Sequence, residues 1–253
     1  MREQQRSIFL QIAGVGVHLY TAMGAVLALL TIMEAINGNT ILALWYSLAS
    51  VFIDSTDGML ARKFNVSKNI PWFDGRRLDD IVDYLTYVFA PMVLLWQNGF
   101  LPEGITGQII AIVPLLASAY QFCRVDAKTD DYKIVDEDHF FLGFPSYWNV
   151  IAFYAVVMQL SPTLVSSIII VCSILVFVPI RYIYPSRTVL WRRVTLIYTS
   201  LCSLGYAVIL WQMPWVNSLM IYFTLSYVVY YFVLSGVLTI RLWQPKTVAN
   251  ANS

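Results

Sequence analysis

Acidic side chains stand inside two of the apolar stretches of this chain. Asp54 and Asp57 belong to one stretch, and Asp79 and Asp83 belong to the next. Helical residues three or four positions apart share a face, so each pair would project from one side of its helix. Ionised carboxylates are costly in an apolar medium, and more so when like charges gather. Divalent cations are the simplest relief, and oxygen-only ligands suit Mg²⁺, Mn²⁺ or Ca²⁺ rather than zinc or copper.

The residues around these acids are suited to a phosphate ligand. Gly58 and Gly75 fall on the same helical faces as the acids and leave room for a bulky group. Arg62 brings a forked donor that matches phosphate oxygens. Two metal ions can clamp a pyrophosphate, and a carboxylate can take a proton from an attacking hydroxyl. The alternative is that the acids form ion pairs with Arg62, Arg76 or Arg77 at the level of the lipid headgroups.

The composition identifies the medium in which these acids lie. The 253 residues are 58% hydrophobic and 12% charged, whereas soluble domains have about 25% charged residues. The formal net charge of +1 gives no basic surface for nucleic acid, and the high hydrophobicity excludes a disordered chain. Three cysteines are too few for a disulfide framework. An integral membrane protein remains.

The apolar runs predict an all-α integral membrane protein with about eight transmembrane helices, since about 20 apolar residues cross a bilayer. The whole chain, 1–253, is expected to form a single polytopic membrane domain, with the acidic motif 54–83 across spans two and three. The expected spans are 12–34, 41–62, 78–98, 105–125, 146–161, 164–183, 194–212 and 216–240.

The distribution of Lys and Arg supports this topology. Basic residues accumulate in cytoplasmic segments, and with both termini inside, all 16 bases fall on inner segments and none on an outer loop. They are Arg2, Arg6, Arg62, Lys63, Lys68, Arg76, Arg77, Arg124, Lys128, Lys133, Arg181, Arg187, Arg192, Arg193, Arg241 and Lys246. The four acids then lie a turn or two beneath the inner surface, where a lipid phosphate also lies.

The motif formed by these residues resembles the signature of the CDP-alcohol phosphatidyltransferase family. That signature is D-x-x-D-G-x-x-A-R followed by G-x-x-x-D-x-x-x-D, and it is matched here by eight positions between Asp54 and Asp83. The gap 63–74 is longer than is common in the family. Its N-I-P-W-F-D stretch, together with 73–89 and 138–149, resembles the bacterial phosphatidylcholine synthases.

The resemblance implies a fold, a reaction and a set of roles. A six-helix family core would lie in a bacterial inner membrane, with the active site at the cytoplasmic face. The phosphatidyl group of CDP-diacylglycerol would pass to choline, giving phosphatidylcholine and CMP. Two divalent ions, Mn²⁺ or Mg²⁺, would be held by Asp54, Asp57 and Asp79, with Asp83 as ligand or general base. The CDP and pyrophosphate site would be lined by Gly58, Ala61, Arg62 and Gly75. Homodimers are common in the family.

Choline recognition is the less specific part of the pattern. A quaternary ammonium is usually bound by aromatic faces, and the candidates at the inner end are Tyr84, Tyr87, Tyr147 and Trp148. Aromatic belts are ordinary in membrane proteins, so packing is an equal or better explanation for each. The acidic loop 126–138 has the charge to attract a cation. The isolated His18 and His139 are expected to be structural.

Two other classes of function stay open. The first is synthesis of another phospholipid from CDP-diacylglycerol, namely phosphatidylserine, phosphatidylinositol or phosphatidylglycerophosphate, in which only the acceptor alcohol differs. The second is a cation-coupled transporter, which would need ionisable groups near mid-membrane and broken helices in repeated halves. The acids here gather at one end, which disfavours a transporter.

Overall fold

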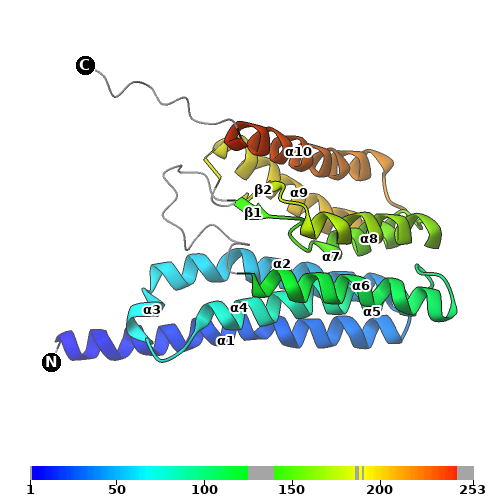
Figure 1. Ribbon diagram of the computed structural model, residues 1–253. Helices are drawn as coiled ribbons and strands as arrows, with labels where there is room; N and C mark the ends of the chain where they lie inside the picture. Colours follow the sequence, from blue (N-terminus) through cyan, green and yellow to red (C-terminus); the bar gives the residue numbers. More distant parts are fainter. Residues whose placement is uncertain (1, 125–139, 186–187, 190, 244–253) are drawn as a thin grey trace, which may run out of the picture. The chain divides into compact units, whose positions relative to one another are not determined.

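The structure is a computed structural model of the chain, and helices dominate it (Figure 1). It describes residues 2–124, 140–185, 188–189 and 191–243, without the side chains of 2–7 and 242–243. The acidic loop 126–138 and His139 lie outside the described residues.

Each of the eight apolar runs expected from the sequence contains a helix. The helices are α1 (Arg2–Ile36), α2 (Thr40–Lys63), α3 (Val66–Asn69), α4 (Gly75–Asp83), the π-helix η1 (Tyr84–Phe89), α5 (Ala90–Gln97), α6 (Gly104–Cys123), α7 (Trp148–Val157), α8 (Pro162–Phe177), α9 (Arg192–Gln212) and α10 (Ser218–Trp243). The consecutive α4, η1 and α5 together fill the third run, and the short α3 lies in the connection between α2 and α4.

Four of the described helices are long and apolar enough to cross a membrane. They contain Ile8–Ile36, Gly104–Cys123, Arg192–Gln212 and Ser218–Arg241. Large apolar side chains are exposed along them, among them Leu19 at 64% and Leu204 at 65%. Such side chains are the ones expected to face lipid, and the chain is a multi-pass membrane protein.

The chain folds as two compact units. The first comprises Met1–Phe122 and Ser146–Ser173, and in it α1 packs along α2, α4 and α5. The approach of α1 to α4 is close at Gly24, because a Cβ there would lie 2.4 Å from Cγ1 of Val82. Small residues allow helices to approach in this way in membranes. This unit contains every predicted site residue.

The second unit comprises Cys123–Pro145 and Ile174–Ser253. In it α9 and α10 are joined by hydroxyl pairs, with Thr195 Oγ1 2.8 Å from Tyr230 Oη and Thr199 Oγ1 2.7 Å from Tyr227 Oη. Interhelical hydrogen bonds of this kind hold membrane helices together where apolar burial gives little driving force.

A small β-ribbon in the second unit departs from the all-α expectation. Strand β1 (Phe140–Leu142) pairs antiparallel with β2 (Arg181–Ile183), with Phe141 opposite Tyr182. The sequence predicted a helix as far as residue 183, but α8 ends at Phe177. Pro179 gives the physical reason, since the residue before a proline disfavours helical geometry.

Candidate active site

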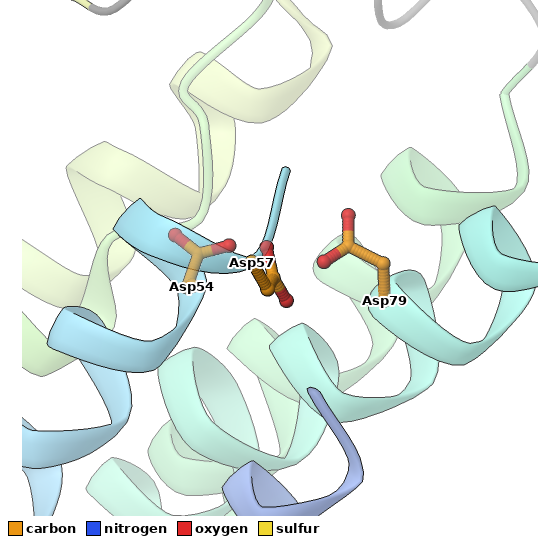
Figure 2. Close-up of side chains that lie close together, drawn as sticks. All are labelled: Asp54, Asp57 and Asp79. Atoms are coloured by element: carbon orange, nitrogen blue, oxygen red, sulfur yellow. The ribbon is translucent and has the colours of Figure 1, made fainter. Parts of the chain in front are cut away.

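Three of the predicted metal ligands lie together. Asp54 and Asp57 extend from α2, and Asp79 extends toward them from α4 (Figure 2). One carboxylate oxygen from each residue lies within 4.8 Å of the other two. Hard divalent cations prefer all-oxygen donors such as these. The residues therefore fit a divalent ion, as the sequence predicted.

The start of α4 fixes the height of Asp79. Asp74 is the N-cap, and its Oδ1 accepts a hydrogen bond from the backbone N–H of Arg77 at 3.1 Å. Side-chain caps of this kind satisfy backbone donors that the first helical turn leaves unpaired. Asp79 consequently lies one turn inside the helix. Arg77 Nε lies 3.9 Å from Asp74 Oδ2 in an exposed pair, so Asp74 is an ion-pair partner of Arg77 outside the metal-ligand cluster.

Helix α1 supplies a donor to the acid cluster from outside the motif. Thr21 Oγ1 donates to Asp57 Oδ2 at 2.8 Å, and both side chains are buried at 7% exposure. One position earlier, the hydroxyl of Tyr20 lies 2.8 Å from Thr56 Oγ1. Hydrogen bonds to a metal-ligating carboxylate orient it for binding. The first helix therefore forms a third wall of the site.

A second donor to the cluster comes from the π-helix. Tyr87 is buried at 8% exposure, and its hydroxyl donates to Asp54 Oδ2 at 2.7 Å. Its ring meets that of Tyr147 edge to face, with centroids 6.3 Å apart and planes at 78°. Two of the four predicted choline residues thus lie together beside the acids.

The π-helical turn has a local cause. Pro91 has no backbone N–H to donate to the carbonyl of Tyr87 four residues earlier, and proline commonly distorts a helix at that point. Single π-helical turns are rare and are frequent at functional sites. Here the turn comes directly after Asp83 and carries Tyr84 and Tyr87.

Tyr84 and Trp148 make their polar contacts to α6. Tyr84 Oη donates to the carbonyl of Leu115 at 3.0 Å. Trp148 is fully buried, and its Nε1 donates to Ser118 Oγ at 2.7 Å. The neighbouring Ser146 Oγ lies 2.9 Å from the same Ser118 hydroxyl. These bonds hold the segment before α7 and so fix the position of Tyr147.

The other predicted residues flank the acid cluster. Asp83 is the last residue of α4, one turn beyond Asp79, and lies within electrostatic range of the Tyr87 hydroxyl. The Asp83 carboxylate is outside the group of three described above. On α2, a Cβ at Gly58 would lie 3.4 Å from Arg62 Nη1, so the guanidinium lies over the glycine.

The sequence as a whole matches one known family. A profile of the family described as CDP-alcohol phosphatidyltransferase matches residues 18–179. The chain belongs to this family. The match includes every position of the acidic motif and begins within α1, at His18.

Individual relatives of this CDP-alcohol phosphatidyltransferase carry one common name. A phosphatidylcholine synthase of Legionella bozemanae is 40% identical over 218 residues, covering 83% of this chain and 97% of that protein. A phosphatidylcholine synthase of Legionella pneumophila is 38% identical over 226 residues, covering 87% and 86%. One from Borreliella burgdorferi is 37% identical over 192 residues, covering 76% and 79%.

Sequence reasoning did not find the contribution of α1 to this phosphatidyltransferase site. Thr21 and Tyr20 have no spacing relation to Asp57 and Thr56, which follow 36 residues later. The available signal was weak: a threonine within an otherwise apolar helix usually bonds its own backbone, as Thr21 also does to Val17 O at 3.3 Å.

Proposed function

We propose that this protein is an O-phosphatidyltransferase that moves the phosphatidyl group of CDP-diacylglycerol to choline, releasing phosphatidylcholine and CMP. The observation that carries the proposal is the meeting of three carboxylates with an aromatic pair, through the bond from Tyr87 to Asp54. An acidic group suited to metal and pyrophosphate thus adjoins two rings suited to a quaternary ammonium. The 37–40% identity to phosphatidylcholine synthases supports the same reaction.

The acids would hold the cofactor. Asp54, Asp57 and Asp79 would bind two divalent ions, Mn²⁺ or Mg²⁺, with Asp83 as a further ligand or as the general base. Bound there, such ions neutralise the diphosphate and stabilise the departing phosphate of CMP. Thr21 and Tyr87 orient two of these carboxylates through their hydrogen bonds.

The remaining motif residues would bind the nucleotide. Gly58, Ala61 and Gly75 leave room for CDP, and the guanidinium of Arg62 over Gly58 is placed to bind phosphate oxygens bidentately. The choline hydroxyl oxygen then forms a bond to the phosphorus that carries diacylglycerol. Its proton passes to the Asp83 carboxylate, and the bond from that phosphorus to the CMP oxygen breaks.

Choline would be recognised by Tyr87 and Tyr147. An ammonium over an aromatic face is attracted by the ring quadrupole, and the negative charge of Asp54 lies at the hydroxyl end of Tyr87. Tyr84 and Trp148, the other two residues predicted for choline, would act from behind, by holding η1 and the start of α7 against α6.

The chain would work as one polytopic domain, 1–253, in a bacterial inner membrane. The family match 18–179 takes in parts of both compact units, which supports a single domain. The placement of all 16 basic residues on inner segments supports eight crossings, cytoplasmic termini and an active site at the cytoplasmic face. A homodimer is part of the proposal by family resemblance.

An acceptor panel tests the proposed reaction. Purified protein in detergent with Mn²⁺ and CDP-diacylglycerol is offered choline, serine, inositol or glycerol phosphate, and CMP and lipid products are measured. The proposal expects CMP and phosphatidylcholine with choline alone. Release of CMP with another alcohol but not with choline would replace the acceptor, and CMP with no alcohol tested would contradict transferase activity.

A further inference from the structure

His18 has a buried nitrogen that the described residues leave without a hydrogen bond. It lies on α1, and its Nε2 is inaccessible to solvent and finds no hydrogen-bond partner in the described part of the chain. Leaving a buried polar atom unpaired is unfavourable, and such an atom in a folded protein calls for an explanation. A bound substrate would supply the missing partner.

The position of His18 on α1 places it at the wall of the active site. It precedes Thr21 by three residues, so the two share a helical face, and Thr21 donates to Asp57 in the acid cluster. His18 therefore lies one turn from a residue that touches a predicted metal ligand, on the side of α1 that faces the motif.

The ring of His18 occupies the space beside the motif glycine Gly75. A Cβ built at Gly75 would lie 2.7 Å from Cε1 of His18, 3.3 Å from Nδ1 and 3.8 Å from Nε2. The ring edge that carries both nitrogens therefore adjoins the first residue of α4. Phe73 packs against the ring, with centroids 4.3 Å apart and planes at 34°. These two contacts fix the orientation of the imidazole.

The place and the chemistry together point to a phosphate oxygen. Gly75 begins α4, where backbone N–H groups and the helix dipole favour an anion. Phosphate oxygens only accept hydrogen bonds, and an imidazole N–H is a donor of matching kind. The ammonium of choline offers no acceptor to this nitrogen.

We propose that His18 is a substrate-binding residue that donates a hydrogen bond from Nε2 to a phosphate oxygen of CDP-diacylglycerol. The proposal rests on the proposed function for the identity of the substrate. It also explains why position 75 is glycine in this chain: any side chain there would displace the imidazole.

Two substitutions separate binding from packing. His18→Phe keeps a ring against Phe73 and Gly75 without the donor, whereas His18→Gln keeps an N–H near the Nε2 position without the ring. Met23→Ala, at an exposed position on the same helix, is the matched control. The readouts are equilibrium binding of labelled CDP-diacylglycerol in detergent with Mn²⁺ and no acceptor, and the KM for each substrate.

The proposal expects the donor to matter more than the ring. His18→Phe should weaken CDP-diacylglycerol binding about 10-fold or more, the effect of losing a hydrogen bond to a charged group. The KM for choline should stay within about twofold of wild type, and His18→Gln should bind better than His18→Phe. If His18→Phe binds as wild type while His18→Gln is weak, His18 only packs. A rise confined to the KM for choline would also overturn the proposal.

A double-mutant cycle keeps the test sharp if His18→Phe fails to fold. Gly75→Ala should weaken nucleotide-lipid binding in wild type by displacing the ring, but should add little in a His18→Ala background, where its Cβ has room. Equal losses in both backgrounds would show that the two positions act independently and would contradict the proposal. Because these measurements omit the acceptor, an acceptor other than choline would overturn the proposed function without touching this result.

Discussion

The hydrogen bond from Thr21 to Asp57 gives the most direct test of how α1 contributes to the site. Thr21→Val replaces the hydroxyl by a methyl group and keeps the β-branched shape. Both side chains are 7% exposed, so water cannot easily take the place of the lost donor. The substitution therefore removes one interaction at Asp57 while leaving the packing of α1 nearly unchanged.

The expected size follows from the charge and the burial of Asp57. A hydrogen bond to a charged group contributes about 1.5–3 kcal/mol, and about 1.4 kcal/mol corresponds to a factor of ten in affinity. Loss of a donor that orients a ligating carboxylate costs a similar amount, about 10- to 100-fold in metal affinity. We expect the Mn²⁺ concentration for half-maximal activity to rise by about that factor.

The assay is CMP release at saturating CDP-diacylglycerol and choline, with Mn²⁺ added back to chelator-treated protein. Thr31→Val is a matched control, because Thr31 lies on the same helix, is 3% exposed and donates to its own backbone at Leu27 O. Thr21→Val should recover most of its rate at high Mn²⁺, and Thr31→Val should follow wild type throughout. Identical Mn²⁺ curves for the two variants would refute the role assigned to Thr21.

Three further predictions concern single side chains. Asp83→Asn should abolish turnover while binding of CDP-diacylglycerol persists, and normal turnover would remove Asp83 from the mechanism. Tyr147→Ala should raise the KM for choline about fivefold, from a cation–π contribution of about 1 kcal/mol, with the KM for CDP-diacylglycerol unchanged. An equal rise in both would contradict a choline contact. Trp148→Phe loses the bond to Ser118 and should lower the unfolding free energy by about 1 kcal/mol, measured by denaturant titration; no loss would show that the bond is not stabilising.

The acid cluster was predictable because its geometry is local. Asp54 and Asp57 share a face through helical spacing alone, and a short connection brings the start of α4 back beside them. Two adjoining helices and one motif are enough to place Asp79 against this pair. The hydroxyl of Thr21 depends instead on how α1 packs along α2, a tertiary contact with no periodicity in the sequence.

The helices were predictable from apolar length, but their interruptions were not. The runs gave eight helical segments close to those observed, whereas the π-helical turn at Tyr84–Phe89 and the end of α8 at Phe177 were missed. In both places a nearby proline, Pro91 or Pro179, removes a backbone donor or restricts its neighbour. The apolar content on either side is the same, so hydropathy alone cannot locate such breaks.

The central claim is that this acidic site transfers a phosphatidyl group to choline with the help of divalent metal. The measurement that tests it most directly is mass spectrometry of lipids formed from CDP-diacylglycerol and deuterated choline by chelator-treated protein, before and after Mn²⁺ is restored. The account predicts labelled phosphatidylcholine and CMP in equal amounts, with metal only, and none from an Asp79→Asn variant. Labelled lipid formed without metal, or CMP released without labelled lipid, would contradict it.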